Sequence, residues 1–488
     1  MAEPQSLDPA DWSGLRALGH RMLDDMFDHL AGLREGPVWR PMPDALRQDL
    51  RRPLPRGAMP PDAVYDDFRR LVLPYATGNL HPRFMGWVHG GGNPVGMLAE
   101  LLAGGLNANL GGRDHAPIEI ERQVIAWASE MLGFPAGASG VLVTGTSIAN
   151  FIGVLVARSA ALGPDVRRDG LSSAPLVAYT SAAAHGCLQR AMDMAGFGCD
   201  ALRMIACDGQ GRLRLDALSD RVADDYARGL RPFLLLGTAG TVDIGAIDDL
   251  AALADIAEAE DLWFHVDGAF GAVAALAPKL RPLLAGIERA DSVAFDFHKW
   301  AQVPYDAGCI VVRDGARQLE TFAAEARYLR RDQRGLAGGG VWPCDLGPDL
   351  SRGFRALKVW MTLSVYGADR IGAIAQQTCD LAATLAARVD REPALQLLAP
   401  VALNIVCFRF VAAEGDLDRL NADIVADLQE SGIAAPSTTT VNGVLAIRAA
   451  IVNHRTNPAD IAILVDAVLE LGRKWSDALG RKEKAPGF

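Results

Sequence analysis

This chain of 488 residues lacks the cysteine pattern of a disulfide framework or a zinc site. It contains seven cysteines, an odd number, and no two of them stand in a Cys-x-x-Cys spacing. This pattern excludes a disulfide framework and offers no ligand set for a zinc site, so we expect no bound metal. Unpaired cysteines are typical of proteins in a reducing compartment, and they predict a cytoplasmic location.

Basic charge and long apolar runs are also scarce. The 48 Lys and Arg residues are outnumbered by 59 Asp and Glu, which gives a net charge of -11. Nucleic acid is therefore not expected as a partner, because a phosphate backbone needs a basic surface. No apolar run reaches the roughly 18–20 residues that span a bilayer, and the first residues lack the pattern of a secretory signal. We expect no membrane partner.

The composition that is present is typical of a well-packed enzyme. Half of the residues are hydrophobic and 22% are charged. The chain is longer than one simple core needs, so we expect a large domain with smaller ones beside it. Changes of pattern predict an N-terminal helical arm over 1–85, a large α/β domain over 86–345, a small α+β domain over 346–475 and a tail over 476–488.

The expected large domain alternates short apolar segments with helical stretches, which is the pattern of a mainly parallel, seven-stranded sheet. In such sheets, ligands bind beyond the carboxyl ends of the strands. Helices are expected at 148–160, 185–195 and 248–260. The seven expected strands are 141–143, 176–179, 202–205, 233–236, 262–266, 292–295 and 309–312.

Helical periodicity predicts the elements on either side of this domain. An amphipathic stripe over 9–34 and a helix near 62–73, joined by prolines, cannot bury their own apolar faces. We therefore expect the arm to pack on the main body or on a second subunit. The small domain is expected to contain helices at 350–366, 371–390, 416–431 and 458–473, strands at 405–408 and 444–447, and a frayed tail from 474 to 488.

Two of the expected strands lead into charged residues that suit a pyridoxal phosphate site. Lys299 follows strand 292–295, and a lysine amine in a dry pocket can form a Schiff base. Asp267 closes the strand before it and can pair with a pyridine nitrogen, while Ala269 is small enough for a ring to lie over it. Pyridoxal phosphate acts as an electron sink, so the pair predicts this cofactor. Taken singly, Lys299 could be a surface lysine and Asp267 a turn residue.

A phosphate cradle is expected where strand 141–143 leads into a helix. Gly145, Thr146 and Ser147 lie at this junction. Hydroxyl groups and free backbone N–H groups at a helix N-terminus bind phosphate. Ser147 could also be a simple helix cap, so the motif is informative mainly in combination with the lysine and the aspartate.

Other candidates follow further strands. His185 could stack on a pyridine ring, His298 could contact the phosphate or tune the neighbouring lysine, and Thr241 could shape the wall around the cofactor. Segment 321–344 is rich in Arg and Gly. It is either a connector between domains or a lid whose Tyr328 delivers a proton after bond cleavage.

Together these residues resemble the pyridoxal phosphate-dependent group II amino-acid decarboxylases, close to the aromatic-L-amino-acid type. The resemblance extends from about residue 10 to residue 470. Each motif alone is unspecific, whereas the combination is highly specific. The matching stretches are His81–Phe84, Thr144–Ser147, Ala184-His185, Gly240-Thr241, His265–Ala269, Asp296–Trp300, Tyr328-Leu329 and Phe354–Trp360.

The resemblance implies the aspartate-aminotransferase-like fold, fold type I of the pyridoxal phosphate-dependent transferases, and a homodimer with the site at the subunit interface. It implies that Lys299 forms the Schiff base with the cofactor, that Asp267 pairs with the ring nitrogen and that His185 stacks on the ring. Tyr328 would protonate the substrate carbon after CO2 leaves, and Asp296 would lie near the phosphate.

The activity implied by the resemblance is decarboxylation of an L-amino acid to its amine and CO2, with an aromatic substrate expected. The substrate segment departs from the aromatic enzymes. Trp87 is retained, but a glycine-rich stretch at Gly90 and the polar residues Asn109 and Arg113 occupy the remaining positions. A polar or acidic amino acid is therefore an alternative substrate, with Arg113 as the candidate partner of its carboxylate.

Three alternative functions stay open at this point. The same scaffold could be an aldehyde synthase, which consumes oxygen after decarboxylation, although the presence of Tyr328 and His185 favours simple decarboxylation. Another pyridoxal phosphate lyase is a second alternative, such as a sphingosine-phosphate lyase relative or a cysteine desulfurase, for which Cys344 would be the reactive cysteine. The third alternative is a catalytically silent cofactor-binding or scaffold protein.

Overall fold

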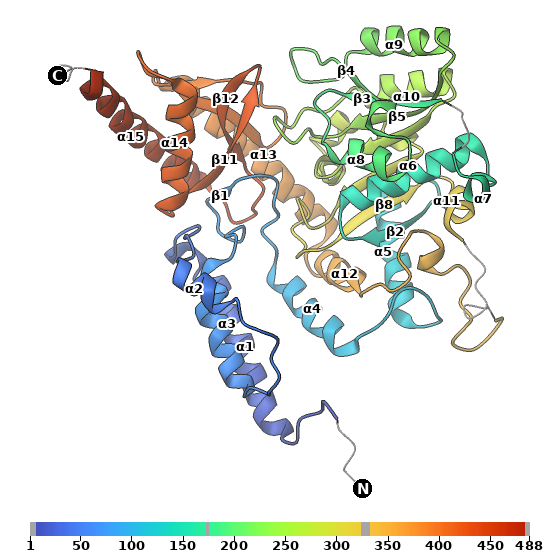
Figure 1. Cartoon of the computed structure of the whole chain (residues 1–488), viewed down its shortest axis with the longest axis horizontal. Helices are drawn as coiled ribbons and strands as arrows, with labels where there is room; N and C mark the ends of the chain where they lie inside the picture. Colours follow the sequence, from blue (N-terminus) through green and yellow to red (C-terminus); the bar gives the residue numbers. More distant parts are fainter. Residues whose placement is uncertain (1–5, 172–174, 324–331, 484–488) are drawn as a thin grey trace.

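The larger sheet is built from the seven apolar segments that the sequence indicates. The computed structural model describes residues 6–171, 175–323 and 332–483. In this sheet the strand order is β2-β8-β7-β6-β5-β3-β4, with β8 antiparallel to both neighbours and the other neighbours parallel (Figure 1). The strands are β2 (Ser139–Val143), β3 (Leu176–Ser181), β4 (Leu202–Ile205), β5 (Arg231–Thr238), β6 (Trp263–Asp267), β7 (Ser292–Asp296) and β8 (Gly308–Val312).

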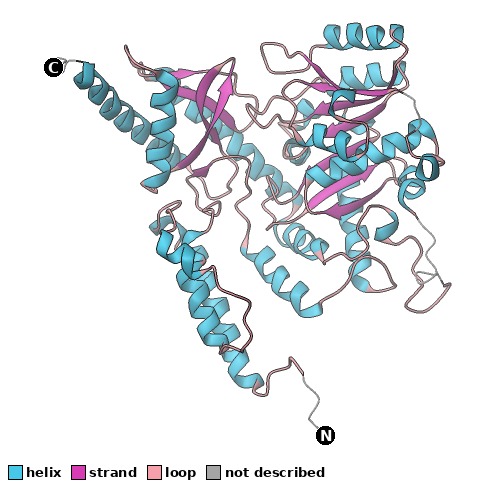
Figure 2. Ribbon diagram, viewed as in Figure 1, coloured by secondary structure: helices cyan, strands magenta, loops and turns pink. Residues whose placement is uncertain are grey.

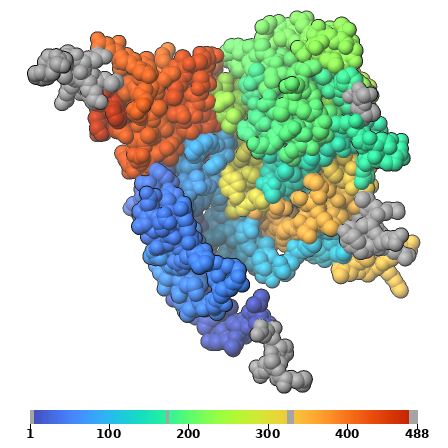
Figure 3. Space-filling view, viewed as in Figure 1, coloured from blue at the N-terminus to red at the C-terminus, as the bar shows by residue number. Residues whose placement is uncertain are grey.

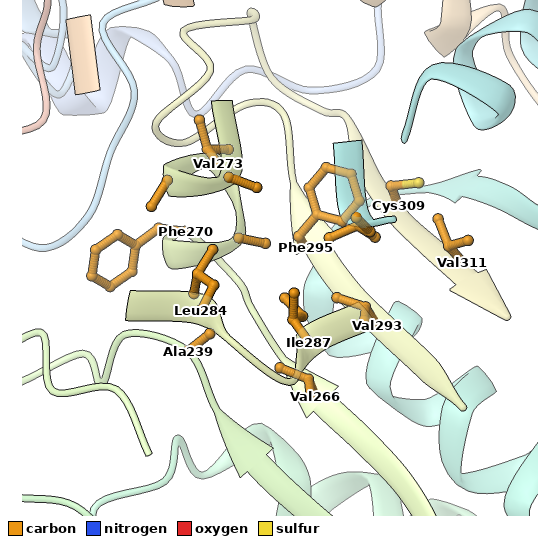
Figure 4. Packing of buried hydrophobic residues seen from close by; sticks show 14 of the residues in the cluster. Ala239, Val266, Phe270, Val273, Leu284, Ile287, Val293, Phe295, Cys309 and Val311 are labelled. Atoms are coloured by element: carbon orange, nitrogen blue, oxygen red, sulfur yellow. The ribbon is translucent and has the colours of Figure 1, made fainter. Parts of the chain in front are cut away.

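Helices cover both faces of this sheet (Figure 2), because successive side chains of a strand point to opposite faces. Leu142 packs on the face of α5 and α10, in the cluster that Figure 4 shows around Val293 and Phe295. Val143 and Leu236 pack on the opposite face, with α6 and α8. The helices of this domain are α4 (Pro94–Leu106), α5 (Ala116–Leu132), α6 (Thr146–Leu162), α7 (Val166–Asp169), α8 (Cys187–Met194), α9 (Leu215–Ala227), α10 (Leu250–Ala259), α11 (Gly315–Phe322) and α12 (Arg355–Tyr366).

The C-terminal region forms a second sheet with its own apolar core, which includes Phe408 and Leu464. The strand order is β1-β11-β12-β10-β9, and all neighbours are antiparallel except β1 and β11. The strands are β1 (Phe84–Met85), β9 (Leu395–Leu397), β10 (Ile405–Phe410), β11 (Ala435–Val441) and β12 (Val444–Ala450), and the helices are α13 (Ala368–Arg391), α14 (Leu417–Glu430) and α15 (Pro458–Glu483).

The N-terminal arm consists of α1 (Trp12–Ala31), α2 (Asp44–Asp49) and α3 (Pro61–Leu71). It projects along one side of the molecule (Figure 3). Its base is held on the small domain by an ion pair of 3.0 Å between Arg34 and Asp460. Among the described residues, no helix is long and apolar enough to cross a membrane.

The prediction of a frayed tail from residue 474 is wrong for most of that segment, because α15 continues to Glu483. Leu471 and Trp475 pack against the core of the small domain, and the Trp475 indole N–H donates to Asp427 at 3.0 Å. These contacts anchor the extra turns of the helix. The helix expected from residue 350 begins only at Arg355, and α2, α4, α5, α11, β1, β9 and β11 were not expected from the sequence.

Candidate active site

The predicted cofactor residues follow strands that run in one direction. Strands β2, β3, β5, β6 and β7 are mutually parallel in direction, since β2 and β7 both pair antiparallel with β8. Their carboxyl ends therefore meet at one edge of the sheet. The turns at this edge carry the predicted phosphate cradle, His185, Thr241, Asp267 and Lys299.

Lys299 lies in the turn after β7, and Asp296 connects it to the N-terminus of α6. Its Nζ atom lies 3.0 Å from Asp296 Oδ2, and the lysine side chain is 25% exposed against 2% for the aspartate. The other oxygen of Asp296 accepts the backbone N–H of Thr146 at 2.7 Å. One buried carboxylate thus positions both the amine and the first residue of the helix.

Asp267 is buried at the end of β6, the strand next to β7. Its carboxylate accepts the backbone N–H of Ala269 at 3.1 Å and the side-chain amide of Asn150 at 3.1 Å. Burial raises the pKa of Asp267, whereas the charge of Lys299 and these two hydrogen bonds oppose that rise. A cationic partner would further favour the ionised form of this carboxylate.

The phosphate cradle has an unpaired donor. Among the described residues, the buried hydroxyl of Thr146 has no hydrogen-bond partner, and Ser147 beside it is exposed. The backbone of Gly145 lies against Gly308 so closely that a Cβ atom on Gly308 would collide with it. The start of β8 therefore supports the turn in front of the helix.

Two histidines lie near these groups. His298 is buried, its Nδ1 accepts the backbone N–H of Ala307 at 3.0 Å, and its ring centroid lies 4.3 Å from that of Tyr305. Burial lowers the pKa of His298, which favours the neutral imidazole. His185 is exposed and lies within electrostatic reach of Asp267, and its Nδ1 accepts the backbone N–H of Cys187 at 3.2 Å.

The segment with Trp87 and Gly90 lies against the lysine turn. A Cβ atom on Gly90 would collide with the carbonyl oxygens of His298 and Lys299, so glycine allows this close approach. Trp87 is 53% exposed, and its ring stacks with that of His89 at 5.7 Å. An exposed aromatic surface therefore adjoins the lysine.

The remaining predicted residues have other surroundings. Asn109 is exposed, and its side-chain oxygen accepts the backbone N–H groups of Gly111 and Arg352 at 2.9 and 3.1 Å. The guanidinium of Arg113 lies 4.6 Å from the centre of the Trp342 ring. Thr241 is buried, and its hydroxyl accepts the backbone N–H of Ala246 at 3.0 Å. Tyr328 lies outside the described residues.

Sequence reasoning missed several residues that contact this site. Asn150 bonds to Asp267, and a polar residue within the apolar run of its helix was a usable signal. Tyr305 contacts His298, and its position shortly after the lysine motif was a weaker signal. Gln302 accepts the backbone N–H of Gly91 at 3.0 Å and so holds the glycine-rich segment, for which the sequence offers no signal.

The residues present fit pyridoxal phosphate. Lys299 provides an amine beside a buried carboxylate, and the orphaned hydroxyl of Thr146 lies at the N-terminus of a long helix, where a phosphate binds well. The buried carboxylate of Asp267 matches a protonated ring nitrogen. We therefore expect these three residues to hold the cofactor.

Comparisons with known proteins agree with this chemistry. The family model of the pyridoxal-dependent decarboxylase conserved domain matches residues 43–411. An aromatic-L-amino-acid decarboxylase of Bacillus atrophaeus is 32% identical over 471 residues, covering 95% of this chain and 96% of the relative. An L-2,4-diaminobutyrate decarboxylase of Rhizobium meliloti (strain 1021) is also 32% identical, covering 86% of this chain and 84% of the relative.

The fold has solved counterparts as well. The structure of Catharanthus roseus tryptophan decarboxylase in complex with L-tryptophan matches with a TM-score of 0.86 at 25% identity, covering 96% of this chain and 100% of that one. The sheet order, the lysine turn and the family match over most of the chain thus agree. The chain belongs to the pyridoxal-dependent decarboxylase family and is a pyridoxal phosphate-dependent carboxy-lyase.

Proposed function

We propose that this enzyme converts an aromatic L-amino acid to its amine and CO2 at a Schiff base formed by Lys299. The observation that carries the proposal is the juxtaposition of Lys299 and Asp267 at the ends of the neighbouring strands β7 and β6. Bound pyridoxal phosphate supplies an electron sink for the electron pair released when the bond between Cα and the carboxylate breaks.

The side chains around the site control protons and orientation. Asp267 would hold the protonated ring nitrogen by accepting its hydrogen bond, and burial would strengthen this charge pair. Asp296 orients the Nζ atom of Lys299, which lies 3.0 Å away. Thr146 and the N-terminus of α6 would bind the phosphate. By resemblance, His185 would pack on the ring face and Tyr328 would donate the proton to Cα.

An aromatic substrate is favoured by the surroundings of Trp87. The exposed indole, His89 and Tyr305 form a chain of ring contacts that ends at His298, next to the reactive lysine. Aromatic side chains gain from such edge and stacking contacts. Of the polar candidates, Arg113 lies over the Trp342 ring, and Asn109 Oδ1 accepts two backbone N–H groups. The aromatic-L-amino-acid decarboxylase relative supports the same substrate class.

A substrate panel tests the proposal. Release of CO2 and amine is measured from tryptophan, tyrosine, phenylalanine, DOPA, 2,4-diaminobutyrate and glutamate. We expect turnover of at least one aromatic substrate and its complete loss in Lys299→Ala. Turnover confined to diaminobutyrate or glutamate would overturn the substrate class, and turnover by Lys299→Ala would overturn the role of the lysine.

The aldehyde synthase alternative differs in its products. An amine without ammonia or peroxide identifies simple decarboxylation, whereas an aldehyde with both identifies the oxidative reaction. If Tyr328 donates the proton to Cα, Tyr328→Phe should lower the rate of amine formation by about 100-fold or more and shift products towards the aldehyde. An unchanged amine yield would remove Tyr328 from the mechanism.

We also propose that the enzyme is a cytoplasmic homodimer with its site at the subunit interface. The exposed apolar side chains of the arm, among them Trp12, Leu15 and Phe27, support a second subunit as the partner of this surface. Cys187, Cys199, Cys207, Cys309, Cys379 and Cys407 are free thiols, which is consistent with a reducing compartment.

A further inference from the structure

A chain of hydrogen bonds extends from Asp267 into the sheet behind the site. Asn150 Nδ2 lies 3.1 Å from Asp267 Oδ2, and Asn150 Oδ1 lies 2.8 Å from His265 Nε2. His265 Nδ1 lies 2.7 Å from Ser292 Oγ, which accepts the indole N–H of Trp263 at 2.8 Å. Four consecutive hydrogen bonds thus connect α6, β6 and β7.

Each donor of this hydrogen-bond chain points towards the Asp267 end. Burial lowers the pKa of His265 to about 3, so the imidazole is neutral and carries one proton. An ionised Asp267 accepts only, so Asn150 turns its amide N–H towards it and its carbonyl oxygen towards His265. The His265 proton therefore lies on Nε2, and Nδ1 accepts the hydroxyl proton of Ser292. Trp263, which can only donate, completes the far end.

The opposite direction does not satisfy the same groups. If Asp267 were protonated and donated to a rotated Asn150, the amide N–H would face His265 Nε2, and the imidazole proton would move to Nδ1. Ser292 would then receive one proton from His265 and another from Trp263. The hydroxyl proton of Ser292 would then have no acceptor within this hydrogen-bond chain. An unsatisfied buried hydroxyl is costly, so the network keeps Oδ2 of Asp267 an acceptor. The N–H that Asn150 donates there stabilises the ionised carboxylate more than the neutral acid.

The helix beside this hydrogen-bond chain leaves room for it. Gly153 lies one turn after Asn150 on α6, and a Cβ atom at this position would lie 2.6 Å from His265 Cε1. The glycine therefore leaves room for the imidazole. Cys187, which also approaches Asp267 at 3.9 Å, has its pKa raised to about 12 by burial and stays neutral. Within the described part of the chain, this thiol, Lys299 and His185 are titratable groups that interact with Asp267.

We propose that this hydrogen-bond chain of fixed polarity keeps Asp267 ionised for the pyridine nitrogen, and that Asn150 and His265 are positioning residues of the cofactor site. The inference rests on the proposed pairing of Asp267 with that nitrogen. Because the chain favours the accepting form of the carboxylate, it offsets part of the cost of burying the charge.

Nitrogen NMR of the holoenzyme tests the inference, with pyridoxal phosphate isotopically labelled at the ring nitrogen. The signal distinguishes a protonated from a neutral ring. We expect a protonated ring in the wild type and in His265→Gln, which retains an amide donor for Asn150. In Asn150→Leu and His265→Leu the signal should move towards the neutral position. The cofactor Kd should rise about tenfold, as expected when a hydrogen bond to a charged group is lost.

Asp267→Asn distinguishes a failure of the pairing between Asp267 and the ring nitrogen from a failure of the role given to the hydrogen-bond chain. If it leaves the signal unchanged, the pairing of Asp267 with the ring nitrogen is wrong. If it moves the signal while both leucine variants keep a protonated ring, the pairing holds and the inferred role of the chain is wrong. Should the leucine variants not fold, Ser292→Ala removes only the hydroxyl, and an unmoved signal there overturns the inference equally.

Discussion

At the scale of single residues, the candidate site depends on buried polar groups with partners from distant parts of the sequence. Asp296 joins Lys299 to Thr146, which precedes Asp296 by 150 positions in the chain. The strand-end residues can be predicted from the sequence, because an apolar run followed by a charged residue marks a strand and its carboxyl end. Asn150 and Tyr305 cannot be predicted in the same way, since only the packing of α6 and of the lysine turn brings them to the site.

His265 gives a prediction about stability at this scale. Its pKa is lowered to about 3 by burial in the folded protein, whereas an unfolded histidine titrates near its ordinary value of about 6.5. The unfolded chain therefore binds the extra proton first as pH falls. The contribution to stability is complete above about pH 6.5 and is lost towards pH 3, by at most about 1.4 kcal/mol per pH unit.

Urea unfolding of the apoprotein between about pH 5 and 7 measures this dependence. His265→Gln should unfold with a shallower dependence on pH, because glutamine does not titrate. His20→Gln, on the exposed face of α1, serves as the control and should keep the slope of the wild type. Identical slopes for all three proteins would contradict the buried, neutral state of His265.

At the scale of elements, the sequence predicts buried apolar strands better than strands that depend on pairing with a distant segment. The seven strands of the larger sheet are confirmed, because each is a short apolar run between polar turns. Strand β11 was missed, since its Pro, Ser and Thr residues are typical of a turn, and β1 has only two residues. Both pair with each other, so tertiary contact rather than local composition determines them.

Helix α6 gives the prediction at this scale. Gly153→Ala should destabilise the protein by about 1–3 kcal/mol, because the new methyl group meets an imidazole held on both sides. Gly19→Ala in α1 is the matched control, since a Cβ atom at that position would have nothing within 4 Å. It should stabilise the helix by up to about 1 kcal/mol. Equal unfolding midpoints for the two variants in urea would show that α6 does not need this glycine.

At the scale of the whole molecule, apolar surface remains on the arm and on α4. Leu102 and Leu106 of α4 are 51% and 63% exposed, in addition to the exposed side chains of α1. Exposed leucines at this density are typical of an interface that a second chain covers.

Light scattering coupled to gel filtration tests the proposed homodimer. We expect the wild type to have the mass of two chains, and the double variant Leu102→Asp, Leu106→Asp to have the mass of one. Met204→Asp is the control, because Met204 is 41% exposed on β4 at the far edge of the larger sheet. A wild type with the mass of one chain at micromolar concentration would refute the dimer.

The most direct test of the whole assignment is to locate the cofactor on the chain. Borohydride reduction of the protein loaded with pyridoxal phosphate converts a Schiff base to a stable amine, and mass spectrometry of its peptides identifies the lysine. We expect the label on Lys299 and no label in Lys299→Ala. Label on another lysine, such as the buried Lys358 that pairs with Glu100, or bound cofactor without any label, would contradict the assignment.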